Sequence, residues 1–174
     1  MAQASSQFEP LAVAVMTVSD TRTEADDSSG DYLAAAAGGA GHNIVGRRIV
    51  VDDIYKIRAC LSAWIADDSV DAVLITGGTG FSGRDSTPEA IAPLFDKLID
   101  GFGELFRYLS YDDIGTSTIQ SRALAGYANY TVIFAMPGST GACQLAWEKI
   151  LAEQLDSRHR PCNFKGVLTV ARSR

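Results

Sequence analysis

The chain contains the stretch Thr76-Gly77-Gly78-Thr79-Gly80-Phe81-Ser82-Gly83-Arg84-Asp85-Ser86-Thr87-Pro88-Glu89. The prediction of the fold starts from this stretch. It follows the apolar run 72–75, which is typical of a buried strand, and it precedes a helical pattern that begins near Pro88. In open α/β sheets, ligands bind in loops at the carboxyl ends of the strands. The stretch therefore predicts a binding loop that carries Arg84 and Asp85 towards a helix start.

The glycines of this loop suit an anion. Glycine adopts positive φ angles at no steric cost, and successive free N–H groups can then surround a negative charge. Thr87 is predicted to cap the next helix, with Pro88 at its first position and Glu89 in its first turn. Asp85 is not needed for this cap, so we expect it to have another task.

Two better-known glycine motifs fit less well. The loop lacks the Gly-Lys-Ser/Thr ending of a Walker A loop. The spelling Gly78-x-Gly80-x-x-Gly83 matches the dinucleotide pattern, but the helix starts too late for the last glycine to pack against its first turn. A nicotinamide-dependent oxidoreductase therefore remains an alternative that rests on spelling alone.

Composition narrows the class of protein. The chain has 174 residues, enough for one domain with a sizeable core, and a formal net charge of −6, which disfavours nucleic acid as a partner. No apolar run is long enough to span a membrane, and residues 1–10 resemble a flexible tail rather than a signal peptide. The three cysteines lack metal spacing, and His42 and His159 lie far apart, so we expect free thiols, a cytoplasmic location and no His/Cys metal cluster.

Hydrophobic patterns predict alternating strands and helices. The predicted strands are 11–18, 43–51, 70–75 and 131–135, and the predicted helices are 31–40, 54–65, 88–98, 101–111 and 142–155. Residues 114–128 are expected to include a further helix, and residues 156–174 form a basic C-terminal tail. Such alternation indicates a single α/β domain over residues 11–155, with a mostly parallel sheet and helices on both faces.

Polar side chains follow the predicted strands. Asp20 follows the first strand, Asp52 and Asp53 follow the second, Asp85 lies in the loop after the third, and the sequence 137–140 begins a helix after the fourth. In a parallel sheet these positions share one edge. Two or three carboxylates beside a glycine loop suit Mg²⁺, and free N–H groups suit phosphate, which together favour phosphoryl or nucleotidyl transfer.

Each of these residues also has a structural explanation. Asp20 and Asp53 are common turn and cap residues, and Ser139 is an ordinary N-cap. Arg84 can simply pair with Asp85 or Glu89. Four large aromatic residues on apolar helices are candidates for contacts between subunits or for the core: Trp64, Phe102, Phe106 and Trp147.

Several motifs together resemble one family. They include the Thr-Gly-Gly-Thr-Gly start of the loop with Arg84-Asp85-x-Thr87-Pro88-Glu89, and also Val18-Ser19-Asp20, Gly101-Phe-Gly-Glu-Leu-Phe-Arg107, Ser121-Arg122-Ala123 and Met136-Pro137-Gly138-Ser139. With these motifs the chain resembles the molybdenum cofactor biosynthesis proteins of the MoaB/MogA type, a group that includes the gephyrin G domain. The resemblance extends over about residues 12–164. Near the C-terminus, the sequence of residues 160–164 looks most like the MoaB side of the family.

The resemblance implies a three-layer α/β/α fold and adenylylation of molybdopterin by Mg-ATP, with release of pyrophosphate. It implies that Gly77, Gly78, Thr79 and Gly80 hold nucleotide phosphates, that Asp85 serves Mg²⁺ and the transfer step, and that Asp53 is a second functional acid. Ser121, Arg122, Gly138 and Ser139 would line the pterin side. Homo-oligomers are also implied, with a hexamer favoured on the MoaB side and a trimer as the alternative.

A non-catalytic role is the main rival to this interpretation. Some members on the MoaB side have no settled activity, so the same edge could hold a pterin or another protein of the pathway without turnover. The discriminating observation is whether wild-type protein releases pyrophosphate.

Overall fold

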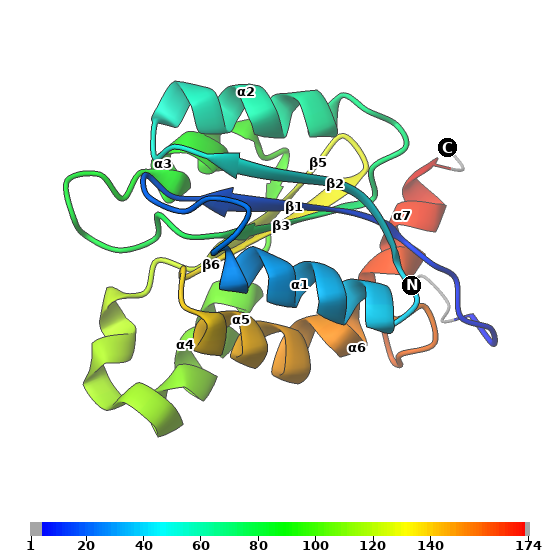
Figure 1. The fold of residues 1–174 in the computed structure, drawn as a ribbon. Helices are drawn as coiled ribbons and strands as arrows, with labels where there is room; N and C mark the ends of the chain where they lie inside the picture. The colour runs from blue at the N-terminus through cyan, green and yellow to red at the C-terminus, as the bar shows by residue number, and fades with distance from the viewer. Residues whose placement is uncertain (1–4, 173–174) are drawn as a thin grey trace.

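The computed structural model describes residues 5–172 and contains one six-stranded sheet with the order β2-β1-β3-β6-β5-β4 (Figure 1). The strands are β1 (Ala12–Val18), β2 (Asn43–Val50), β3 (Ala72–Thr76), β4 (Lys97–Leu98), β5 (Leu124–Ala128) and β6 (Thr131–Met136). Strands β2, β1, β3 and β6 are parallel, whereas β5 runs antiparallel to β6, and β4 runs antiparallel to β5. The predicted α/β fold with a mostly parallel sheet is confirmed.

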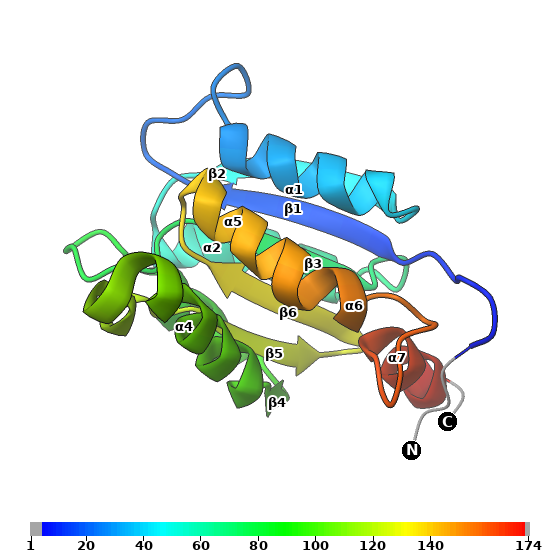
Figure 2. The ribbon, with the colours of Figure 1, turned by 90° about the horizontal axis from the view of Figure 1, so that it is seen from below.

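Helices cover both faces of this sheet (Figures 1 and 2). One face carries α2 (Ile54–Ile65) and α3 (Thr87–Ile91), and the other carries α1 (Ser28–Gly39), α4 (Asp100–Ile114) and α5 (Thr140–Ala146). Helix α5 continues without a break through the π-helical stretch η3 (Trp147–Leu151) into α6 (Ala152–Gln154). The molecule therefore has the three layers of an α/β/α domain.

The central strands are apolar on both faces because each face is buried. Along β3, Leu74 packs with the α1, α4 and α5 layer, whereas its neighbours Val73 and Ile75 pack with α2 and α3. Strand β6 alternates in the same way, with Phe134 in the first layer and Ile133 in the second. This two-sided burial explains why the parallel strands were easy to predict from continuous apolar runs.

Two stretches differ from their sequence predictions. The helix predicted over 88–98 is wrong: α3 ends at Ile91, and a 3₁₀ turn η1 (Ala92–Leu94) leads to the edge strand β4. Pro93 lies in that turn and has no N–H to continue an α-helix. Residues 114–128 contain the 3₁₀ helix η2 (Gly115–Gln120) and then strand β5, which was not predicted. The small residues of β5 conceal it, and a Cβ at Gly126 would lie 2.2 Å from the Phe95 ring.

The terminal segments pack against the domain. Within the predicted N-terminal tail, Ser5 and Glu9 donate backbone hydrogen bonds to Ser157, while residues 1–4 lie outside the described range. Within the predicted basic tail, helix α7 (Phe164–Arg172) places the Phe164 ring 5.4 Å from the Phe134 ring, and Leu168 is in the core. The bounds of both tails stay a prediction. Among residues 5–172, none of the helices combines the length and the apolar character that a membrane crossing requires.

The large aromatic residues that were candidates for subunit contacts mostly belong to the core. Phe102, Phe106 and Trp147 are 4%, 2% and 6% exposed, and Trp64 is half-buried. Exposed large apolar side chains gather instead on α4 and η2. They are Leu105, Tyr108, Tyr111, Ile114 and Ile119.

Candidate functional site

The ends of the parallel strands meet at one edge of the sheet, as predicted from the strand-end residues. From β1 the chain passes to β2 on one side and then to β3 on the other, so the strand order reverses between β1 and β3. Such a reversal leaves a crevice at the carboxyl ends of the two strands, where open α/β sheets bind ligands.

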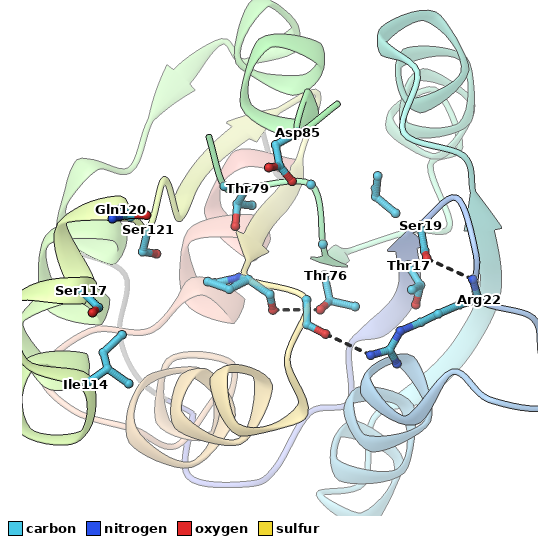
Figure 3. A pocket seen from close by; sticks show the side chains of 16 residues that line it. Thr17, Ser19, Arg22, Thr76, Thr79, Asp85, Ile114, Ser117, Gln120 and Ser121 are labelled. Atoms are coloured by element: carbon cyan, nitrogen blue, oxygen red, sulfur yellow. Dashed lines mark hydrogen bonds between the residues drawn. The ribbon is translucent and has the colours of Figure 1, made fainter. Parts of the chain in front are cut away.

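A pocket of about 440 Å³ occupies this crevice (Figure 3). One wall comes from the ends of the strands, namely segments 17–19, 76–80 and 137–138. Arg22 and Asp85 add opposite charges to it. The facing wall comes from the end of α4 and from η2. It consists of Ile114, Ser117, Gln120 and Ser121.

The first turn of the loop accepts only glycine. Gly77 and Gly78 have φ angles of +99° and +64°. A Cβ at Gly77 would lie 2.2 Å from the Val18 carbonyl oxygen, and a Cβ at Gly78 would lie 2.3 Å from Thr87 Oγ1. Contacts this short are forbidden, so the two glycines let β3 turn sharply beside the end of β1.

This turn leaves backbone donors at the pocket. The Gly77 amide donates to the Met136 carbonyl at 3.0 Å. The amides of Gly78, Thr79 and Gly80 donate to no backbone or side-chain acceptor within residues 5–172. All three residues line the pocket, so the site offers uncommitted N–H groups of the kind that bind anions.

Asp85 lies at the same pocket, on the far side of the exposed loop tip. Its Oδ2 accepts the Ser82 amide at 2.7 Å, and its own amide donates to the Ser82 carbonyl at 3.0 Å. The carboxylate also faces Gly80, where a Cβ would lie 2.8 Å from Oδ2. The loop therefore folds back so that the acid lies beside the glycine amides.

The predicted cap at Thr87 is wrong. Residue 86 is the N-cap of α3 and makes no side-chain cap hydrogen bond. Thr87 is buried, and its Oγ1 donates to the Gly77 carbonyl at 2.8 Å, while its amide donates to the Gly78 carbonyl at 2.9 Å. Thr87 thus joins the end of the loop to its start.

The other acids at this edge hold loops in place. Asp53 is the N-cap of α2 and accepts the amides of Tyr55 and Lys56, both at 3.0 Å. Asp52 Oδ1 accepts the Ser86 amide at 3.0 Å. Asp20 pairs with Arg84 at 2.7 Å, so the expected pairing of Arg84 with Asp85 or Glu89 is wrong.

The acids do not gather around one point. Within the described part of the chain, residues 5–172, no three His, Cys, Asp or Glu side chains group closely enough to hold a metal ion by themselves. Asp85 is the acid that lines the pocket. A metal at this site would therefore take one carboxylate from the protein and its other oxygens from elsewhere.

Most of the predicted site residues come together. Gly77, Gly78, Thr79, Gly80, Asp85, Ser121 and Gly138 line the pocket, whereas Asp53, Arg122 and Ser139 do not. Ser139 is the N-cap of α5 and accepts the Ala142 amide at 3.2 Å. The Arg122 side chain donates hydrogen bonds to backbone carbonyls of the glycine loop.

Sequence reasoning missed two parts of the pocket. Arg22 donates to the Gly138 carbonyl at 3.4 Å and lies 3.8 Å from the buried carboxylate of Asp27. The polar sequence Ser19-Asp20-Thr21-Arg22 after the first strand was the available signal for it. The wall residues Ile114, Ser117 and Gln120 gave no comparable signal, because the 3₁₀ conformation of η2 has no clear hydrophobic period.

Cys143 lies just beneath the pocket but is not placed as a nucleophile. Its Sγ is 3.1 Å from Oγ1 of Thr76, and the residue is fully buried. Burial raises the pKa of the Cys143 thiol above its ordinary value, although hydrogen bonding to Thr76 opposes part of this shift. A thiol of raised pKa remains protonated at neutral pH, so nucleophilic cysteine chemistry is not favoured.

The fold and the pocket define an open α/β protein with a pocket, lined by uncommitted backbone amides, at the point where its strand order reverses. A family model described as a probable molybdopterin binding domain matches residues 14–157. The chain is 59% identical over 164 residues to molybdenum cofactor biosynthesis protein B of Escherichia coli (strain K12). The matched region covers 94% of this chain and 96% of that protein.

Solved structures agree with this similarity. The crystal structure of a molybdenum cofactor biosynthesis protein B has a TM-score of 0.82 and 44% identity, covering 84% of this chain and 92% of that chain. The structure of tungsten cofactor synthesizing protein MoaB from Pyrococcus furiosus has a TM-score of 0.76 and 37% identity. The match covers 83% of this chain and 92% of that chain. The chain belongs to the molybdopterin-binding domain family of molybdenum cofactor biosynthesis proteins, as its motifs predicted.

Proposed function

We propose that this member of the family acts in molybdenum cofactor biosynthesis as a Mg²⁺- and ATP-dependent molybdopterin adenylyltransferase. The observation that carries the proposal is the juxtaposition of the unpaired glycine amides with Asp85 in one pocket. An oxygen of the terminal phosphate of molybdopterin forms a bond to the α-phosphorus of ATP. The bond from that phosphorus to the bridging oxygen breaks, and pyrophosphate leaves.

The backbone supplies most of the phosphate binding in this proposal. The amides of Gly78, Thr79 and Gly80 donate to phosphate oxygens. Gly77 allows the chain to pass close to the end of β1, so that the turn can form. Arg22 adds a positive charge to the same wall, beside the end of β1 (Figure 3). Fixed donors aimed at a site of developing negative charge stabilise a transition state without having to reorganise.

The donor set at Asp85 fits Mg²⁺. This ion is usually held by one or two carboxylates together with substrate phosphates and water, so a single acid beside a phosphate cradle is sufficient. When bound, Mg²⁺ neutralises charge on the phosphate oxygens. Asp85 is the residue of this chain that would hold it, and the Ser82 amide fixes the position of that carboxylate.

The remaining candidates are assigned by position. Ser121 and Gly138 line the pocket and are proposed for the pterin side. Ser139 and Asp53 already accept backbone amides as helix caps, so we propose that they act by fixing the turns beside the pocket. Replacement of Asp53 by Asn preserves the cap, and loss of activity in that variant would show a further role.

The test is a coupled assay of pyrophosphate release with purified molybdopterin, ATP and Mg²⁺. We expect Asp85→Asn to abolish turnover while the unfolding midpoint changes little. Asp67→Asn is a matched control, because Asp67 accepts the Ser69 amide at 2.9 Å in a turn before β3, away from the pocket. Undiminished turnover in Asp85→Asn would remove this acid from the mechanism.

A second candidate is a non-catalytic protein that binds a pterin or another protein of the pathway. It would use the same uncommitted amides of Gly78, Thr79 and Gly80, and an anion site of this kind needs no metal. Wild-type protein that binds molybdopterin tightly and releases no pyrophosphate would support this candidate and exclude the transferase.

We also propose a homo-oligomer, with a hexamer favoured over a trimer, in a reducing cytoplasm. The exposed apolar side chains of α4 and η2 provide the contact surface, and Tyr108 is 74% exposed. The thiols of Cys60, Cys143 and Cys162 are free. Sedimentation should give an assembly at micromolar concentration, whereas a monomer would contradict the proposal. Cell fractionation tests the location.

A further inference from the structure

Arg122 makes an unusually complete set of contacts with the glycine loop. Its Nε donates to the Gly80 carbonyl at 2.8 Å, and its Nη2 donates to the Asp85 carbonyl at 2.8 Å. Its backbone amide donates to the Thr79 carbonyl at 3.2 Å. One residue from a distant part of the sequence therefore holds both ends of the exposed segment 81–84.

The charge of Arg122 is balanced within the same group of residues. Its Nη1 forms an ion pair with Glu89 in the first turn of α3. Its Cζ lies 5.1 Å from the centre of the Phe81 ring, a distance at which a guanidinium is attracted to an aromatic face. The side chain is only 23% exposed, so little of the guanidinium is left for a ligand.

The chain around Arg122 is itself held in place. Arg107 of α4 donates from Nη1 to the carbonyls of Ser121 and Ala123, at 3.3 Å and 3.0 Å. Ser121 lines the wall that faces the glycine loop. The same short segment therefore forms one wall of the pocket and holds the loop that forms the other.

We propose that Arg122 is a positioning residue, which places the Asp85 carboxylate and sets the width of the pocket, rather than a residue that contacts the pterin. The proposal deepens the proposed function, because it concerns how that site is held. Without the bond from Nη2, the Asp85 backbone is free to move relative to Gly80. Errors of about 1 Å in the position of a reacting group can cost roughly 100-fold in rate.

The chain offers a matched control in Arg58 of α2. Arg58 donates from Nε to the Ala90 carbonyl at 3.0 Å and from Nη2 to the Glu89 carbonyl at 2.8 Å. Its Cζ also lies over an aromatic ring, 5.9 Å from the centre of Tyr55. Both arginines donate to two backbone carbonyls and lie over an aromatic ring, but Arg58 holds helix α3, whereas Arg122 holds the loop and also pairs with Glu89.

The experiment compares Arg122→Lys with Arg58→Lys in the full chain. Lysine keeps the charge but cannot span two carbonyls with a planar group. Amide hydrogen exchange of segment 82–87 reports on the loop, because Ser82, Asp85 and Thr87 have hydrogen-bonded amides. We expect this segment to exchange about 10-fold faster in Arg122→Lys and at the wild-type rate in Arg58→Lys, a ratio worth about 1.4 kcal/mol.

Kinetics supply the second readout. In Arg122→Lys we expect kcat to fall roughly 10- to 100-fold, while KM for molybdopterin changes less than about twofold. A raised KM with unchanged exchange would show that Arg122 contacts the substrate and would overturn the proposal. Exchange and kcat equal to those of Arg58→Lys would overturn it as well.

Failure of the proposed function gives a different pattern. Wild-type protein without any turnover would exclude the transferase, and the exchange measurement would still decide the role of Arg122. Faster exchange confined to segment 82–87 then supports the positioning role, and unchanged exchange rejects it.

Discussion

The loops that follow β3 and β6 both bring glycine to the pocket, but they are held in different ways. The β6–α5 loop is short: the Gly138 carbonyl accepts Ser29 Oγ at 2.8 Å, and Ser139 caps the helix that follows at once. The β3–α3 loop is longer, its residues 81–84 are exposed, and it is tied by Thr87 at its end and by Arg122 from another part of the chain.

The difference follows from what each loop has to carry. The β6–α5 loop brings Pro137 and Gly138 to the pocket but no charged side chain, so the strand and the helix are enough to place it. The β3–α3 loop must also place the carboxylate of Asp85, which requires a longer excursion from the sheet. Ordering such an excursion costs conformational entropy, and contacts with buried or distant groups are needed to offset that cost. Positioning contacts are therefore expected on the loop that carries the acid.

The largest effect is expected from adding one methyl group to each loop. Gly77→Ala places Cβ 2.2 Å from the Val18 carbonyl oxygen at a φ of +99°, whereas Gly138→Ala places Cβ 3.2 Å from the Gly77 Cα. We expect Gly77→Ala to lower the free energy of unfolding by about 3 kcal/mol or more and Gly138→Ala by about 1 kcal/mol, measured by urea denaturation.

Gly83→Ala is the control for this comparison, because a Cβ there meets nothing within 4 Å. It should leave the free energy of unfolding within about 0.5 kcal/mol of the wild-type value. Equal destabilisation by Gly77→Ala and Gly138→Ala would mean that the two turns are equally tolerant, which the geometry forbids.

A smaller effect is expected from removing the hydroxyl group that fastens each loop. Thr87→Val leaves the Gly77 carbonyl without the buried donor Oγ1, and we expect a loss of about 1–3 kcal/mol in the free energy of unfolding. Ser139→Ala removes an exposed helix cap, and we expect a loss of about 1 kcal/mol or less. Chemical denaturation of both variants measures the difference.

The two variants should also differ in the pocket. Thr87→Val should speed amide exchange at Thr87, whose amide donates to the Gly78 carbonyl, and at Ser86, whose amide donates to Asp52. Ser139→Ala should leave both amides unchanged. A larger loss of stability in Ser139→Ala would show that the shorter loop is the more dependent on its hydroxyl.

The parts of the site that sequence could predict are those with a local cause. The apolar run before Gly77 predicts a buried strand, and the glycines after it predict a turn at the carboxyl end of the sheet. Asp85 was identified because it is not needed for a cap. The family motifs agreed with this interpretation.

The parts that could not be predicted depend on contacts between distant residues. Thr87 has the sequence position of a helix cap, but its hydroxyl turns inwards because the Gly77 carbonyl lies beside it. The hydrogen bonds of Arg122 to the Gly80 and Asp85 carbonyls were not predicted either, because these residues lie 42 and 37 positions away in the sequence. Strand β5 was missed because packing against Phe95 requires Gly126 and removes the usual β-branched pattern. Tertiary packing determined each of these outcomes.

The smallest effect concerns Cys143, which lies where the two loops meet. Its Sγ is 3.1 Å from Oγ1 of Thr76, and that Oγ1 donates to the Pro137 carbonyl at 3.0 Å. Burial raises the pKa of this thiol in the folded state above the ordinary value of 9.0. The unfolded chain therefore loses this proton at a lower pH than the folded chain does.

The contribution of the buried Cys143 thiol to the free energy of unfolding is therefore fully present below about pH 9. It is lost as the pH rises towards the pKa of this thiol in the folded state. We expect the free energy of unfolding of the wild type, minus that of Cys143→Ala, to fall between pH 8.5 and 10.5, by no more than about 1.4 kcal/mol per pH unit. The subtraction cancels the titration of other groups. A difference that stays constant over this range would mean that Cys143 ionises in place, and that the contact between the two loops opens readily to water.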